Sequence, residues 1–518
     1  MSENRETSPP ASGDPAVMDL DHAARYRAIA TRDARFDGRL FTGVKTTGIY
    51  CRPVCPARTP KAENVVFFTS AAAAQAAGFR PCLRCRPETS PDLGAWRGTS
   101  NTVSRALALI ETGALDAADV EALASRLGVG ERQLRRLFRQ HLGASPVAVA
   151  QTRRVLLAKQ LIHETRLPMA QVALASGFGS IRRFNETFQA LYARPPGALR
   201  TGSAAEVGLG AGDVLTLRLP YRPPYDWAAM VGFLAKRAIP GVELVGAERY
   251  ARTIALGPDR GLIEVAPVSG DRLEVRLHFP RLAALPTLIA RLRRLFDLAA
   301  DPQAINAHLA LDPALAPLVA QRPGLRVPGA WDGLELAIRA ILGQQITVSA
   351  ATALAGRLVR IHGEPLPEHL AGRIEGLTHV FPSAETLAAA DLSILGMPRA
   401  RAAALSAVAA AVLADPLIFA GHPSLEVGVA RLKAVPGIGE WTAQYIAMRQ
   451  LREPDAFPHG DVGLMRALTD AEGRRPTAAA LLTRAEAWRP WRAYAALHLW
   501  ASDAPAAELD KPDDRTAA

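Results

Sequence analysis

Four cysteines are the residues of this sequence whose type and spacing point most directly to chemistry. They are the only cysteines among its 518 residues, and they form a C-x3-C pair followed by a C-x2-C pair: Cys51, Cys55, Cys82 and Cys85. Two close pairs joined by a loop can bring four thiolates to one tetrahedral Zn²⁺. Two disulfides are the alternative, but disulfides are typical of small secreted domains, and no apolar signal segment opens this chain. We therefore predict one zinc ion, both structural and thiolate-activating, and a reducing cytoplasm.

The residues around the cysteines extend this motif. They are TTGIYCRPVCPAR at 46–58, ENVVFF at 63–68 and AAGFRPCLRCRPE at 76–88. The segment resembles the N-terminal zinc domain of the Ada-type adaptive-response family. That resemblance implies that Cys51 accepts a methyl group from a DNA methylphosphotriester, once per molecule, since the product is a thioether. A thiolate is the required nucleophile, and a neutral phosphotriester approaches it without phosphate repulsion. Neighbouring arginines are expected to hold flanking phosphates: Arg52, Arg58, Arg80, Arg84 and Arg86.

Two helix-turn-helix patterns follow the zinc segment. The first runs from Asp119 through the glycine turn at 127–130 to Gln140, and the second runs from Met169 through the turn at 176–179 to Phe188. The pair resembles an AraC-type DNA-binding domain, although two helix pairs used only for protein contact are the alternative. The candidate recognition helices offer polar residues to a major groove: Arg132, Gln133, Arg135, Arg136, Ser180, Arg182, Arg183 and Asn185.

The period of the apolar residues changes between 213 and about 300. Leu215, Leu217 and Leu219 alternate with polar residues, and so do the apolar residues at 273–279, whereas Asp226 to Ala238 has a helical pattern. This arrangement predicts a small antiparallel α+β domain, which by itself indicates no function.

A second chemical motif lies in the C-terminal third. Trp331 to Leu342 is predicted to be a helix, and LKAVPGIGEWTA at 432–443 predicts two helices joined by a hairpin. Gly437 and Gly439 would let the hairpin backbone approach a DNA phosphate, so that amides of the following helix can donate to it. Asp461 follows about twenty residues later. Capping of the helix that begins beside it is the alternative role for this carboxylate.

The hairpin and the later aspartate together resemble the HhH-GPD superfamily of DNA glycosylases, and most closely its AlkA-type 3-methyladenine DNA glycosylase II members, over residues 205–503. The resemblance implies that Asp461 is catalytic, stabilising the cationic sugar or activating water. It also implies that three aromatic residues line the base pocket: Trp441, Tyr445 and Trp500. Electron-rich rings can hold a cationic alkylated purine after it has flipped out of the duplex, although these rings could instead be core aromatics.

The sequence departs from the superfamily pattern at two positions. Gln345 stands where some members insert an apolar wedge into the duplex, and Trp441 stands where lyase-type members carry a lysine. The C-terminal cysteines of the iron-sulfur members are also missing, as is the cysteine nucleophile of the Ada-type C-terminal methyltransferase, since no cysteine follows Cys85. We therefore expect a monofunctional glycosylase with no iron-sulfur cluster and no repair of O6-alkylguanine.

Composition agrees with a chain that acts on DNA. It has 61 Lys and Arg against 50 Asp and Glu, a formal net charge of +11, and a pI near 9.9, which favours a polyanionic partner. No apolar run approaches the roughly 18 residues of a membrane span. We expect double-stranded DNA, both alkylated and promoter DNA, as partner, RNA polymerase as a further partner, no membrane, a monomer, and a cytoplasmic, bacterial nucleoid-associated location.

The predicted fold class is multidomain and mainly α. We expect a small zinc-bound α+β module at 19–90, an AraC-type double helix-turn-helix at 99–200, an antiparallel α+β domain at 205–320, and an all-α helix-hairpin-helix glycosylase domain at 321–503. A disordered lead at 1–18 and a disordered tail at 504–518 are expected outside them. The predicted function is DNA alkylation repair combined with methylation-activated transcription regulation. The alternative is a transcription factor whose C-terminal half binds DNA without excising bases.

Overall fold

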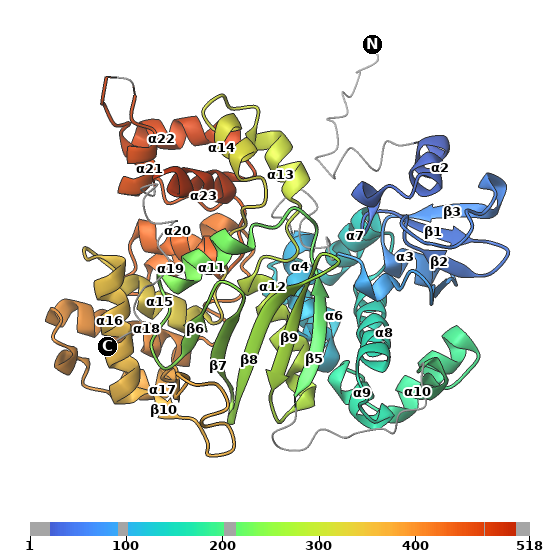
Figure 1. Cartoon of the computed structure of the whole chain (residues 1–518), viewed down its shortest axis with the longest axis horizontal. Coiled ribbons are helices and arrows are strands. Elements are labelled where there is room, and N and C mark those ends of the chain that lie inside the picture. The colour runs from blue at the N-terminus through green and yellow to red at the C-terminus, as the bar shows by residue number, and fades with distance from the viewer. Residues whose placement is uncertain (1–20, 92–101, 201–213, 471, 504–518) are drawn as a thin grey trace, which may run out of the picture.

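The computed structural model describes residues 21–91, 102–200, 214–470 and 472–503. The predicted lead at 1–18 and the predicted tail at 504–518 lie outside these ranges. In Figure 1 the zinc module and the helices of the second helix-turn-helix unit lie to one side of a central five-stranded sheet, and most helices of the C-terminal half lie to the other, while α4 (Thr102–Glu111) and α6 (Val120–Arg126) are seen behind the sheet. Within the described residues, no helix combines the length and apolar character that crossing a membrane requires.

The zinc module is a four-stranded sheet with one helix before it and one helix packed on it. Its elements are α2 (His22–Ala30), β1 (Phe41–Val44), β2 (Ile49–Cys51), β3 (Val65–Phe68), α3 (Ala71–Ala76) and β4 (Arg80–Pro81). The strand order is β3-β1-β2-β4, and only the β2–β4 pair is parallel. Because β2 ends at Cys51 and β4 ends next to Cys82, this parallel pair brings the two halves of the cysteine motif together.

The helices that follow in the described residues contain both predicted helix-turn-helix units. They are α4 (Thr102–Glu111), α5 (Ala114–Ala117), α6 (Val120–Arg126), α7 (Glu131–Leu142), α8 (Pro146–Glu164), α9 (Met169–Ala175) and α10 (Ile181–Tyr192). Gly128 and Gly177 lie in the two turns with φ of +67° and +87°, a conformation that favours glycine. The side chains of Asp119 and Ser180 cap α6 and α10.

The α+β domain contains the five-stranded sheet of Figure 1. Its elements are β5 (Leu215–Pro220), α11 (Trp227–Ala235), β6 (Glu243–Val245), β7 (Tyr250–Leu256), β8 (Asp259–Val268), β9 (Arg272–His278) and α12 (Leu285–Leu295). The strand order is β5-β9-β8-β7-β6, antiparallel throughout, as the sequence predicted. Apolar residues of this sheet share one buried cluster with α8, α9 and α10, so the second helix-turn-helix unit packs directly on this domain.

The C-terminal half is helical apart from one short strand pair. Its elements are α13 (Pro302–Leu309), α14 (Ala316–Gln321), α15 (Gly333–Leu342), α16 (Val348–His362), β10 (Glu364–Pro365), β11 (His379–Val380), α17 (Ala384–Ala389), α18 (Arg399–Ala414), α19 (Leu425–Lys433), α20 (Glu440–Arg449), α21 (Val462–Ala467), α22 (Ala478–Ala485) and α23 (Arg492–Asp503). One large apolar cluster joins these helices.

Two helices are shorter in the structure than the sequence predicts. The helix expected from Trp331 begins at Gly333, because the Asp332 side chain accepts hydrogen bonds from the amides of Leu334 and Glu335 and so caps it. Trp331 is instead a buried residue of the preceding segment. The helix expected at 226–238 spans Trp227–Ala235, with Asp226 as its cap.

Candidate functional site

The four cysteine sulfurs form one compact group. Their Sγ atoms all lie within 4.8 Å of one another. A tetrahedral site with Zn–S bonds of about 2.3 Å places its sulfurs about 3.8 Å apart, so the group fits Zn²⁺. The backbone amides of Arg52 and Arg84 donate to Cys85 Sγ and Cys82 Sγ, each at 3.3 Å, which favours negative charge on these sulfurs. Cys82 and Cys85 are buried, whereas Cys51 and Cys55 are partly exposed.

The arginines of the zinc motif have different roles. The predicted phosphate-binding role is wrong for Arg52, which is ion-paired with Asp37 and donates to the Cys85 carbonyl at 3.2 Å. Arg86 likewise pairs with Glu88 and Glu164 within the protein. Buried carboxylates already pair with these two guanidinium groups, so both arginines stabilise the folded zinc module. Arg58 and Arg84 are exposed, and Arg80 lies over the Tyr192 ring of α10.

A buried lysine joins the zinc module to the helix-turn-helix domain. Lys159, on α8, is fully buried, and its Nζ donates to Glu88 at 2.7 Å and to the Cys82 carbonyl at 2.8 Å. Burial lowers the pKa of Lys159, although Glu88 opposes that shift. No local pattern in the sequence indicated this contact, because Lys159 and Cys82 lie on different domains.

Helices α7 and α10 present the predicted DNA-facing residues to the outside. Their eight predicted contact residues are all exposed: Arg132, Gln133, Arg135, Arg136, Ser180, Arg182, Arg183 and Asn185. Two of the arginines are held by i,i+4 ion pairs, Arg135 with Glu131 at 2.5 Å and Arg182 with Glu186 at 2.7 Å. Ser180 also has a structural role, since its hydroxyl accepts the Arg183 amide at 3.1 Å.

The hairpin between α19 and α20 uses its two glycines differently. Gly437 has φ of +90°, and a Cβ there would lie 2.3 Å from the Ala404 Cβ, so this glycine is required by packing and backbone conformation. Gly439 precedes α20, and a Cβ at this position would meet no atom within 4 Å. The open side of the hairpin, where a phosphate could approach the amides of α20, is therefore at Gly439.

Asp461 lies where three elements of the C-terminal half meet. Its Oδ1 accepts hydrogen bonds from the Leu464 amide at 3.1 Å and from the Trp500 indole at 2.9 Å, and its Oδ2 accepts one from the Trp441 indole at 2.8 Å. The capping role left open by the sequence is therefore present, since Asp461 caps α21. The same carboxylate also joins α20 and α23 through the two indoles.

The three predicted pocket aromatics form one group beside this carboxylate. The rings of Trp441 and Tyr445 are stacked, with centroids 5.0 Å apart and an interplanar angle of 12°. The Trp500 ring meets Tyr445 edge-on at 6.5 Å. All three rings are only partly buried and, with Asp461, line a cavity of about 720 Å³ between the α+β domain and the helical half. Tyr445 and Trp500 also pack against the large apolar cluster of the helical half, so these two rings belong both to the cavity wall and to the edge of the core.

Two of the arginines that line the same cavity lie against its aromatic residues and were not predicted from the sequence. Arg449 Nη1 donates to the Tyr445 hydroxyl at 2.6 Å, and both Arg449 and Arg237 lie over the Phe233 ring, at 4.9 Å and 3.8 Å. Burial by itself would raise the pKa of the Tyr445 hydroxyl, but the charges of Arg449 and Arg237 lower it below its ordinary value. The sequence could have predicted a role for Arg449, because it follows Tyr445 by one helical turn and therefore lies on the same face of α20.

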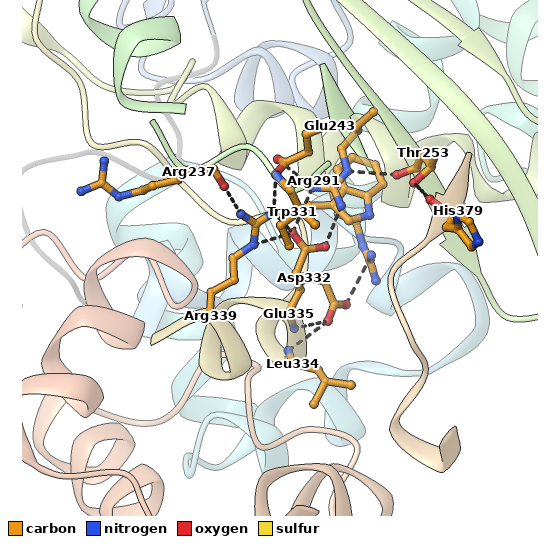
Figure 2. Close-up of polar contacts among 12 residues, drawn as sticks. Arg237, Glu243, Thr253, Arg291, Trp331, Asp332, Leu334, Glu335, Arg339 and His379 are labelled. Carbon is orange, nitrogen blue, oxygen red and sulfur yellow. Dashed lines mark hydrogen bonds and ion pairs between the residues drawn. The ribbon is translucent and has the colours of Figure 1, made fainter. Parts of the chain in front are cut away.

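A buried charge network forms one wall of this cavity. Glu335, on α15, pairs with Arg252 of β7 at 2.6 Å and with Arg339 at 2.7 Å, and Glu243 pairs with Arg339 as well. Burial opposes ionisation of Glu335, but Arg252 and Arg339 lower its pKa to about 2. Figure 2 shows the Arg237 carbonyl facing Arg339, whose Nη1 donates to it at 2.6 Å, while the Arg237 side chain extends away from the network. The network thus fixes the backbone that carries Arg237.

Gln345 lies in the middle of the loop between α15 and α16. It is exposed and has φ of +61°, and the neighbouring Ile346 and Val348 are exposed apolar residues. The structure therefore places Gln345 on the surface beside two apolar side chains.

Four family models match the chain in order. They are described as the metal binding domain of Ada (residues 24–88), a helix-turn-helix domain (123–202), the AlkA N-terminal domain (216–332) and the HhH-GPD superfamily base excision DNA repair protein (338–493). The probable bifunctional transcriptional activator/DNA repair enzyme AlkA of Mycobacterium tuberculosis is 43% identical over 485 residues, which cover 93% of this chain and 97% of that protein. This chain belongs to that AlkA family.

Two further relatives each match part of this AlkA-family chain. DNA-3-methyladenine glycosylase 2 of Escherichia coli is 39% identical over 292 residues, which cover 54% of this chain and 95% of that protein. The bifunctional transcriptional activator/DNA repair enzyme Ada of the same organism is 39% identical over 124 residues, which cover 24% of this chain and 34% of that protein. The predicted domain types and the single zinc ion are confirmed. The roles of individual site residues stay predictions.

Proposed function

We propose that the C-terminal half hydrolyses the N-glycosidic bond of alkylated purines such as 3-methyladenine in DNA. Water adds to the sugar C1′, the C1′–N bond breaks, and the free base and an intact abasic site are released. The observation that carries this proposal is the Asp461 carboxylate, held by two indoles at an aromatic cavity beside the hairpin. A charge fixed in this way can stabilise the positive charge that develops on the sugar.

The remaining cavity residues support the same reaction. Trp441, Tyr445 and Trp500 offer ring faces to a flipped, cationic base. Trp441 occupies the position of the lysine of lyase-type relatives and its indole is engaged with Asp461, so no amine forms a Schiff base from this position. The enzyme is therefore monofunctional. Gly439 and the amides at the start of α20 hold the DNA backbone.

Cys51 is proposed as the methyl acceptor of the zinc module. It is more exposed than Cys82 and Cys85, which are buried. The sulfur attacks the methyl carbon of a methylphosphotriester, the carbon–oxygen bond breaks with its electron pair staying on oxygen, and a phosphodiester anion leaves. Bound zinc would supply the charge that keeps the sulfur deprotonated. Each molecule reacts once, because the thioether product is stable.

The regulatory function follows from the order of the domains. The methylated chain is proposed to bind promoter DNA through α7 and α10 and to activate transcription with RNA polymerase, as a monomer at the bacterial nucleoid. The basic, exposed residues of both helices support this proposal.

Base release from methylated duplex DNA tests the central claim. The purified chain is expected to release 3-methyladenine in repeated turnovers and to leave abasic sites. A chain that binds this DNA, and in its methylated form binds promoter DNA, but releases no base would instead be the alternative, a transcription factor whose C-terminal half does not excise.

A further inference from the structure

Helix α4 of the DNA-binding half contacts the helix-hairpin-helix unit directly. Its Arg105 is bonded to Glu453 through both carboxylate oxygens, with Nε at 3.0 Å from Oε1 and Nη2 at 3.2 Å from Oε2. A third bond runs from Arg105 Nη1 to the Pro423 carbonyl, at 2.7 Å. The Arg105 side chain is only 9% exposed and that of Glu453 only 4%, so this ion pair is shielded from solvent at the interface between the two units.

The two partners of Arg105 flank the hairpin unit. Pro423 directly precedes Ser424, which caps α19, and Glu453 follows α20. A single guanidinium thus holds the segment that enters α19 and the segment that leaves α20. The turn of the first helix-turn-helix also contacts Pro423, because a Cβ at Gly128 would lie 3.0 Å from the Pro423 ring.

The segment after α20 is in turn tied to the cavity. The Glu453 amide donates to the Ala447 carbonyl at 3.0 Å, and the neighbouring Pro454 carbonyl accepts the Ala493 amide of α23 at 2.9 Å. Helix α20 carries Trp441 and α23 carries Trp500, the two indoles that hold Asp461. Arg105 therefore holds the segment that is hydrogen-bonded to both cavity helices, α20 and α23.

Helix α4 also packs against the first candidate recognition helix. Val103, Leu107 and Ile110 of α4 share one buried apolar cluster with Leu134 and Phe138 of α7. One helix thus lies between the DNA-facing helix of the regulator and the hairpin of the glycosylase.

We propose that Arg105 is a positioning residue of the glycosylase reaction, through which the regulatory half sets the placement of the hairpin on lesion DNA. This inference rests on the proposed excision activity. The hairpin amides contact the DNA backbone in the ground state and the transition state alike, so displacement of the unit weakens DNA binding more than it slows bond breaking. Trp441 and Trp500 remain bonded to Asp461, which keeps the reacting groups in place.

Arg105→Lys is the informative variant. Lysine keeps the positive charge beside Glu453, but one ammonium cannot meet both carboxylate oxygens and the Pro423 carbonyl with the geometry of the guanidinium. We expect the half-saturating concentration of lesion duplex to rise about five- to ten-fold, with the single-turnover rate at saturation within about two-fold of the wild type. Arg281→Lys, which alters a more exposed Arg–Asp pair at 2.6 Å beside the sheet of the α+β domain, is the control and should change neither quantity.

A purely structural role for Arg105 predicts a different result. The melting temperature and the active fraction would fall, whereas the half-saturating concentration would stay constant. Arg105→Leu combined with Glu453→Leu separates the two roles further, since an apolar pair can restore stability without restoring the bonds to the hairpin. A wild-type half-saturating concentration in Arg105→Lys, or its recovery in the double variant, overturns the proposal.

Binding is also measured on a duplex that carries a non-cleavable abasic-site analogue. This assay does not depend on excision, so a failure of the proposed glycosylase activity is distinguished from a failure of the positioning role. The expected loss of affinity in Arg105→Lys is again about five- to ten-fold, and unchanged affinity would contradict the inference.

Discussion

Replacement of Asp461 by asparagine isolates the contribution of one negative charge. Asparagine is also a good helix cap, so α21 should still begin at Val462 and the bond from the Leu464 amide should persist. If the amide oxygen takes the place of Oδ1, the amide NH2 group faces the Trp441 indole, and a donor then meets a donor. The variant therefore loses the charge and one indole contact, while the cavity keeps its aromatic walls.

The size of the effect follows from the charge that the sugar develops. Two unit charges about 4 Å apart interact by roughly 4 kcal/mol at an effective dielectric constant near 20. This interaction is made mainly in the transition state, so its loss should slow excision about a thousand-fold. DNA binding should change little, because the substrate is not yet cleaved when it binds.

The assay is single-turnover release of 3-methyladenine from methylated duplex DNA by Asp461→Asn at saturating enzyme. Affinity for a duplex with a non-cleavable abasic-site analogue is measured in parallel. Asp119→Asn, which changes a capping aspartate of α6 far from the cavity, is the matched control and should excise normally. A loss of less than about ten-fold in Asp461→Asn would refute the assignment of Asp461 as the charge that stabilises the transition state.

Three further predictions concern the product, the pH dependence and the zinc module. Borohydride should trap no covalent complex with abasic DNA, and efficient trapping would reveal an amine nucleophile. Burial raises the pKa of Asp297 to about 6, so the contribution of this group to the free energy of unfolding should fall as pH rises from about 4 to 6. Asp297→Asn, at a φ of +49° that asparagine tolerates, should remove this contribution from the pH dependence of the unfolding free energy, measured by denaturant titration at several pH values. Methylation of Cys51 removes one negative charge, so binding to the chain's own upstream DNA should tighten about ten-fold, and Cys51→Ala should show no such change.

Local patterns in the sequence predicted the zinc centre and the secondary structure of two further domains. The cysteine spacing sufficed for the zinc centre, since a parallel strand pair needs only to bring two close pairs together. The turn glycines and the alternating apolar residues likewise predicted the helix-turn-helix units and the antiparallel sheet. In these cases the signal and the structure lie within one short segment, so spacing along the chain is enough.

Contacts between distant segments could not be predicted in this way. Arg52 was expected to face phosphate because its neighbours are basic, but its partner Asp37 comes from a different loop of the module. Lys159 and Arg105 pair with carboxylates 71 and 348 residues away. A charged residue in the sequence has the same local pattern whether water or a buried partner satisfies it, so only the tertiary structure distinguishes the two.

The observed capping role of Asp461 is compatible with its proposed catalytic role. A carboxylate can accept about four hydrogen bonds, two at each oxygen. Oδ1 already accepts the cap amide of Leu464 and the Trp500 indole, whereas among the contacts of the described residues Oδ2 accepts only the Trp441 indole. The cap therefore occupies one oxygen and orients the carboxylate, which leaves Oδ2 as the oxygen with capacity for a water molecule or for the developing sugar cation. An aspartate that caps a helix beside an aromatic cavity is thus fixed in orientation by the same bonds that could have suggested a purely structural role.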